Sequence, residues 1–132
     1  MRHRHERGAA TVEFALVLPL LLLLTFGILA FGYAFHVQTV LDNAARDAVR
    51  VAALTSGSQA PAEARAVARA SASSAVTLSD EQIGVDLSAC ATPVPLASDR
   101  LAHVTIELED FSLLGVFGPI TLTGTGSMRC NG

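Results

Sequence analysis

The sequence predicts an α+β fold with a long N-terminal transmembrane helix, an amphipathic continuation of that helix, a second Ala-rich helix and a small three-stranded antiparallel sheet. Three observations support this prediction. Residues 14–35 carry no charged side chain. Apolar residues then recur at helical spacing as far as residue 54, and beyond residue 78 the apolar pattern changes to a period of two.

The chain divides into a basic leader over residues 1–8, a long helix over residues 9–54 and a small α+β domain over residues 55–132. The leader contains three of the nine Arg residues, and the chain has no Lys. Without the leader, six Arg stand against eleven acidic residues. Such an acidic body has no basic patch for phosphates, so we expect no nucleic-acid partner.

Residues 14–35 are long enough to span a bilayer. At 1.5 Å per residue, 22 helical residues cover a hydrocarbon core of about 30 Å. Pro19 lies inside this run and is tolerated in membrane helices. We therefore predict a single membrane span that contacts lipid.

The charges that flank the span predict its orientation. The leader is rich in Arg, whereas Arg46 and Arg50 on the far side alternate with Asp42 and Asp47. Cytoplasmic flanks of membrane helices carry the excess of positive charge. The N-terminus is therefore expected in the cytoplasm and the C-terminal domain in the periplasm, anchored in the inner membrane.

The remaining elements follow from hydrophobic periodicity. A helical stripe is formed by Val37, Val40, Leu41, Ala44, Ala45, Ala48, Val51 and Ala52. Residues 62–76 are Ala-rich and predict the second helix after Pro61. Strands are predicted around residues 83–88, 101–109 and 120–130, where apolar and polar residues alternate. Residues 111–119 are apolar and irregular, which suits a loop over the core or a partner surface.

Cys90 and Cys130 both follow the membrane span, at the predicted ends of the first and last strands. Their spacing fits no zinc site. In the periplasm they could form a disulfide that closes a loop of about 40 residues and contributes roughly 4 kcal/mol. Two free thiols are the alternative.

Catalytic and metal-binding patterns are not found in the sequence. Beyond the leader, His36 lies at the membrane edge and His103 on the polar side of a strand, so neither sits beside a nucleophile. His, Cys, Asp and Glu do not cluster at metal-ligand spacing. We therefore expect a protein that is not an enzyme and that needs no cofactor or metal.

Glu13 is the most informative residue, because an isolated acid at the mouth of a membrane span is costly unless something pairs with it. It follows Gly8 by five residues and precedes Phe14, the first residue of the apolar run. Gly8, four residues and then Glu13 and Phe14 resemble a prepilin-type leader. Residues 7–19 as a whole resemble the TadE-like proteins, minor pilins or pseudopilins of the tight-adherence (Flp, type IVb) pilus.

The resemblance implies roles for particular residues. Gly8 would be the last leader residue, and a membrane prepilin peptidase would cut between Gly8 and Ala9. Glu13 and Phe14 would then act in assembly and register, with the Glu13 carboxylate near the new amine of Ala9. The implied partners are the peptidase, other pilin subunits and the inner-membrane assembly platform. The implied function is assembly of adhesive pili for surface attachment and biofilm formation, with the chain in the membrane or in the extracellular fibre.

Several alternatives remain open at this stage. The chain could be a bitopic, signal-anchored periplasmic interaction module. It could also be a small secreted domain cleaved near Ala34, because Gly32, Tyr33 and Ala34 form a passable signal-peptidase site. TadF-like and TadG-like relatives share the same N-terminal pattern. Neither the N-methylation of Ala9 nor a position in the fibre follows from the sequence.

Overall fold

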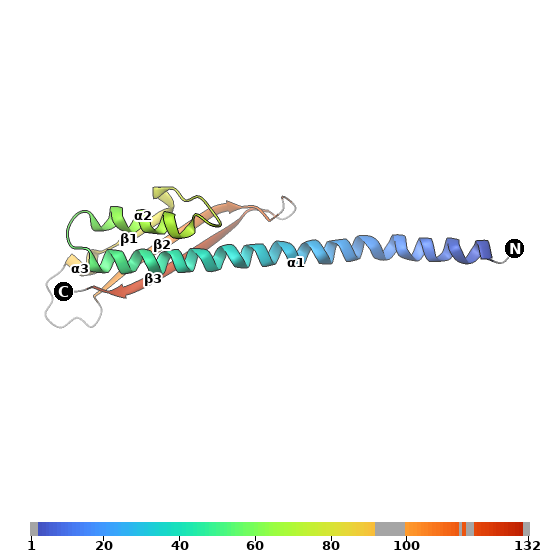
Figure 1. The fold of residues 1–132 in the computed structure, drawn as a ribbon, viewed down its shortest axis with the longest axis horizontal. Helices are drawn as coiled ribbons and strands as arrows, with labels where there is room; N and C mark the ends of the chain where they lie inside the picture. Colours follow the sequence, from blue (N-terminus) through green and yellow to red (C-terminus); the bar gives the residue numbers. More distant parts are fainter. Residues whose placement is uncertain (1–2, 92–99, 114, 116–117, 131–132) are drawn as a thin grey trace. The chain divides into compact units, whose positions relative to one another are not determined.

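The computed structural model describes residues 3–91, 100–113, 115 and 118–130. Its helices are α1 (His3–Leu54), α2 (Ala60–Ala72) and the short α3 (Ser88–Ala91). Its strands are β1 (Ile83–Asp86), preceded by a 3₁₀ turn at Asp80–Gln82, β2 (Leu101–Phe111) and β3 (Ile120–Arg129). Figure 1 shows the long α1, which is followed by α2 and the sheet. The predicted α+β class, with one long apolar helix, a second helix and three antiparallel strands, is confirmed.

The chain forms two compact units, one ending at Tyr33 and the other beginning at Ala34. The first unit contains the N-terminal part of α1, which remains helical through Pro19. The second contains the rest of α1, α2, α3 and the sheet. The hydrophobic core lies in the second unit.

The sheet has the order β1-β2-β3, and both pairs of neighbouring strands are antiparallel. Period-two alternation places Ala102, Val104 and Ile106 of β2 on one face, where all three are fully buried. Ile83 of β1 pairs with Ile106 and is also buried. The opposite face carries exposed polar residues, so only one face of the sheet belongs to the core.

Two glycines let β3 approach the backbone of α1. A Cβ added at Gly124 would lie 2.5 Å from the carbonyl carbon of Leu41, and one added at Gly126 would lie 2.6 Å from the carbonyl oxygen of Ala45. Real Cβ atoms do not come so close, so any side chain here would push the strand from the helix. Glycine is therefore required at both positions for this packing.

Helix α2 is secured by alanines at four-residue steps. Ala60, Ala64, Ala68 and Ala72 are its buried residues. Their methyl groups allow a close helix contact in the core that also includes Ala48 and Ala52 of α1. Ser71 Oγ donates a hydrogen bond of 2.9 Å to Asp47 of α1. The helix begins earlier and ends earlier than the predicted residues 62–76.

The first strand is shorter than the sequence suggested. Asp86 ends β1, because its carboxylate accepts the backbone N–H of Ser88 at 2.9 Å and turns the chain into α3. Cys90 therefore lies in α3 and not at the end of a strand. Cys130 directly follows β3, which ends at Arg129, one residue earlier than predicted.

The far end of the β2–β3 hairpin is irregular. The register shifts between Leu108 and Phe111, and Asp110 adopts a positive φ of 56°. Asp tolerates this conformation better than most residues. Within the apolar segment 111–119, Leu113 is buried at 6% exposure. Residues 114, 116 and 117 lie outside the described residues, so the partner surface predicted there is not described as a whole.

Candidate functional site

Gly8, Ala9, Glu13 and Phe14 all lie on α1 and all are exposed. Nothing lies within 4 Å of the place where a Cβ would stand on Gly8, so the backbone there is open to another molecule. Because Gly is a poor helix former, the helix opens more easily at this residue than at its Ala neighbours, by about 1 kcal/mol. A peptidase that needs extended backbone would therefore find Gly8 easier to unwind than those neighbours.

Helical geometry places Ala9 and Glu13 on the same face, one turn apart. Residues at this spacing have Cβ atoms roughly 5–6 Å apart. If the chain were cut after Gly8, the amine of Ala9 would become the positive end of the helix. A carboxylate near a helix N-terminus is stabilised by that charge and by the helix dipole. The arrangement can thus offset one new positive charge with one existing negative charge in the same chain.

Most of the large apolar residues that follow Glu13 are exposed. Exposed fractions are 63% at Phe14, 72% at Leu16, 71% at Leu23 and 75% at Phe35. Within the described residues, α1 is the one helix long and apolar enough to cross a membrane. An exposed apolar surface of this size is typical of a helix that contacts lipid or other helices.

Small residues in the apolar part of α1 would allow another helix to come close to its backbone. Gly27 and Gly32 have no atom within 4 Å of an added Cβ and are open to a neighbouring helix. Ala30 and Ala34, which share a face at four-residue spacing, are already buried, at 4% and 9% exposure. The open positions are therefore the two glycines.

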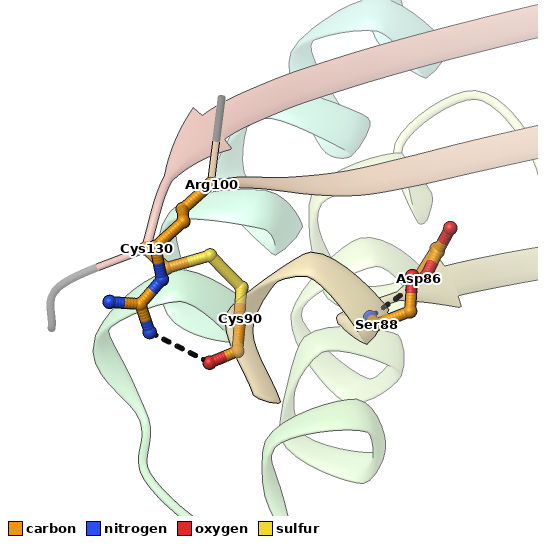
Figure 2. Close-up of a disulfide and its surroundings, with 5 residues drawn as sticks. All are labelled: Asp86, Ser88, Cys90, Arg100 and Cys130. Carbon is orange, nitrogen blue, oxygen red and sulfur yellow. Dashed lines mark hydrogen bonds between the residues drawn. A yellow bond between two sulfur atoms is a disulfide. The ribbon is translucent and has the colours of Figure 1, made fainter. Parts of the chain in front are cut away.

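Cys90 and Cys130 are joined by a disulfide that connects α3 to the end of β3 (Figure 2). Their Cα atoms are 5.6 Å apart, which is ordinary for a disulfide. Arg100, which directly precedes β2, donates from Nη2 to the carbonyl oxygen of Cys90 at 2.9 Å. The backbone N–H of Cys130 donates to the carbonyl oxygen of Arg100, also at 2.9 Å. This network holds α3 and the ends of β2 and β3 together.

A cavity of about 370 Å³ lies beside the disulfide. Its lining includes both cysteines and small residues such as Ala52, Gly57 and Ala60.

Asp86 and His103 form a polar pair beside this network, since they are opposite each other in the β1–β2 register. The pKa of Asp86 is lowered, mainly because the backbone N–H of Ser88 donates to its carboxylate. The Ser88 hydroxyl lowers this pKa further, burial raises it, and the charge of His103 lowers it. The pair is exposed and solvated, as is usual for charged groups at the rim of a sheet.

Within the described residues, no group of three or more His, Cys, Asp and Glu side chains is arranged to hold a metal ion. His36 and His103 are exposed. His103 has Asp86 as its registered neighbour, and no nucleophilic pair is formed there.

Sequence reasoning missed the glycines at the helix–strand contact. Gly124 and Gly126 alternate with Thr123, Thr125 and Ser127. Two successive residues on the inward face of this strand are therefore glycines. Such a pattern indicates a close backbone approach. The partner on the other side, Leu41 and Ala45 of α1, could not be identified before the fold was known.

The family described as TadE-like protein matches this chain over residues 8–50. The match begins at Gly8, includes Glu13 and the apolar run, and ends within the part of α1 that packs on the sheet. It confirms the resemblance drawn from residues 7–19. Neither a curated protein nor a solved structure matches the chain.

Proposed function

We propose that this protein, whose residues 8–50 are similar to the TadE-like family, is a minor pilin or pseudopilin that takes part in assembling tight-adherence pili. The observation that supports this proposal most directly is the exposed apolar helix that begins beside Glu13. The second unit is folded around the far half of the same helix. A chain of this kind carries a folded domain on a helix that other helices can pack against.

In this proposal α1 crosses the inner membrane once, with its N-terminus in the cytoplasm and the second unit in the periplasm. The prepilin peptidase removes residues 1–8 and leaves Ala9 as the first residue. Lipid surrounds the apolar half of α1 before assembly. Other pilin helices or the assembly platform replace part of that lipid during assembly, and Gly27 and Gly32 allow them to come close.

Glu13 has two roles in this mechanism. Within the subunit it offsets the new amine of Ala9 one turn away. In a staggered array of helices it can instead pair with the amine of a neighbouring subunit, because a charge in lipid gains most from a partner of opposite sign. Phe14 lies beside it and fills the apolar contact at the same level. The pairing then fixes the register between helices, and the role is structural and not enzymatic.

The experiment that tests this proposal is intact-mass analysis and N-terminal sequencing of the protein from its native membranes. We expect a mature chain that begins at Ala9. A chain that begins at Met1 would identify an uncleaved, anchored periplasmic module. A chain that begins at Phe35 would identify a secreted domain, and either result would exclude the pilin role.

A further inference from the structure

The outer edge of β3 carries unpaired backbone groups. The N–H of Cys130 donates to the carbonyl oxygen of Arg100, which places this pair in a hydrogen-bonded position of the β2–β3 ladder. Hydrogen-bonded and non-hydrogen-bonded pairs alternate in antiparallel sheets. Thr123, Thr125 and Ser127 therefore turn their N–H and C=O groups away from β2.

A side-chain contact supports this assignment. Gln38 of α1 donates from Nε2 to the carbonyl oxygen of Thr123 at 2.7 Å. That oxygen is therefore free of the ladder and points outward. Thr125 and Ser127 are also exposed, and among the described residues no partner occupies their outward backbone groups. The outer edge of β3 thus offers backbone hydrogen-bond donors and acceptors. The Gln38 side chain uses one of these acceptors, the carbonyl oxygen of Thr123.

The opposite edge of the sheet is covered. Arg65 of α2 donates from Nε to the carbonyl oxygen of Ile83 at 3.2 Å, and α2 packs along β1. Edge strands are usually protected by such cover, or by Pro and Lys in the strand itself. From Ile120 to Met128, β3 contains neither Pro nor any charged residue. Its edge is therefore suited to pair with another strand.

A polar stripe of α1 accompanies this edge. It consists of Gln38, Asp42, Arg46 and Arg50 at four-residue steps. Four helical residues rise about 6.0 Å, and two strand residues rise about 6.6–6.8 Å. Since Gly124 contacts Leu41 and Gly126 contacts Ala45 and Arg46, helix and strand run in the same direction, and each step of the stripe follows one outward residue of β3.

The stripe becomes basic along the strand. Arg46 and Arg50 are exposed, and the ion pair between described residues, Arg69 with Asp80, lies on a different part of the domain. Asp42 is next to Gln38, with its carboxylate 3.5 Å from the amide nitrogen. Counted in these steps from Gln38 beside Thr123, Arg46 lies level with Ser127 and Arg50 with Arg129, and neither guanidinium group forms an ion pair with a described acid. Carboxylates are the complementary ligands for such groups.

We propose that the outer edge of β3, together with Arg46 and Arg50, is a docking site for an extended acidic segment of another polypeptide. The segment adds as a fourth strand and hydrogen-bonds to Ser127 and Arg129, whose backbone groups face away from β2. Every second side chain of the segment faces α1, and acidic residues at these positions pair with the two arginines. The proposal concerns the second unit alone and does not depend on cleavage after Gly8.

The test is amide hydrogen exchange of the full-length protein in detergent micelles with a short peptide in which Glu and Val alternate, at millimolar concentration. We expect exchange at Ser127 and Arg129 to slow by at least about tenfold. The same peptide with Lys in place of Glu should give no protection. Equal protection by both peptides, or none by either, would overturn the proposal.

Two sets of variants, each with a control, separate loss of peptide binding from loss of folding. Ser127→Pro removes an outward N–H that takes no part in the ladder, so it should abolish protection at Arg129, whereas Ser127→Val should keep it. Arg46→Glu combined with Arg50→Glu should reverse the preference to the Lys peptide. Arg69→Glu makes the same type of substitution once on α2 and should leave the preference unaltered. Protection that rises with protein concentration without peptide would show a second copy on the edge and refute the acidic partner.

Discussion

Gly126 of β3 lies directly against Ala45 of α1, so close that an added Cβ would be 2.6 Å from the Ala45 carbonyl oxygen. Gly124 makes the same contact with Leu41, two residues earlier on the strand and one turn earlier on the helix. The helix is thus held by the sheet over two successive steps.

Substitution of these glycines should destabilise the second unit. For Gly126→Ala we expect a loss of about 1–3 kcal/mol in the free energy of unfolding, because helix and strand must move apart. Gly124→Ala should cost a similar amount. Denaturant unfolding of the full-length protein, followed by circular dichroism, measures the effect. Gly84→Ala is the matched control, since its Cβ would lie 3.6 Å from Thr105 and should change stability by less than about 1 kcal/mol. Equal losses at Gly84 and Gly126 would contradict the close-contact explanation.

Removal of the disulfide should lower stability by roughly 4 kcal/mol, because the unfolded chain gains the freedom of a loop with a sequence separation of 40. The double variant Cys90→Ala, Cys130→Ala avoids free thiols and should unfold at lower denaturant concentration. The wild-type protein should shift by the same amount when its disulfide is reduced. If reduction also shifted the double variant, the effect would not come from this bond.

Replacement of Glu13 should separate processing from assembly. Glu13→Ala leaves Gly8 and Ala9 unchanged, so we expect normal cleavage by mass spectrometry. Loss of a charge pair in the membrane should cost about 2 kcal/mol at each contact and reduce assembled pili by more than about tenfold. Pili are counted by electron microscopy. Glu109→Ala, which removes an exposed acid from β2, serves as the control and should assemble normally. Normal piliation in the Glu13 variant would rule out its role in register.

The stability of the second unit should fall at acidic pH through Asp86. Its pKa is lower in the folded protein than its ordinary value of 3.8, because Ser88 stabilises the carboxylate. The resulting stabilisation is complete above that value and is lost as the pH falls through the lowered pKa. Melting temperatures of wild type and Asp86→Asn should therefore differ at neutral pH and converge in strong acid. A difference that stays constant with pH would show that the carboxylate charge is not responsible.

The elements with strong, local hydrophobic patterns were predictable from the sequence. The apolar run, the helical stripe around Leu41 and the alternation of Val104 and Ile106 each identify an element and its buried face without reference to the rest of the chain. The stripe was nevertheless incomplete. Val49 and Ala53 are buried at 3% and 7% exposure, because α1 contacts both the sheet and α2 and so buries a wider arc than one stripe.

The features that could not be predicted from the sequence depend on contacts between elements of the fold. Period-two alternation could not show that Asp86 ends β1, because a hydrogen bond from Ser88 turns the chain there and places Cys90 on α3. The pairing of Cys90 with Cys130 was one of two alternatives until the fold brought their Cα atoms to 5.6 Å.

The sequence by itself determined that the chain has an apolar helix led by Glu13 and followed by a small α+β domain, because hydrophobic periodicity is a property of neighbouring residues. Only the tertiary structure decided that β3 lies on α1 through Gly124 and Gly126, and that its outer edge stays open beside Arg46. These features arise from backbone atoms that approach each other across about 80 residues of sequence, and no local pattern specifies which backbone a glycine will meet.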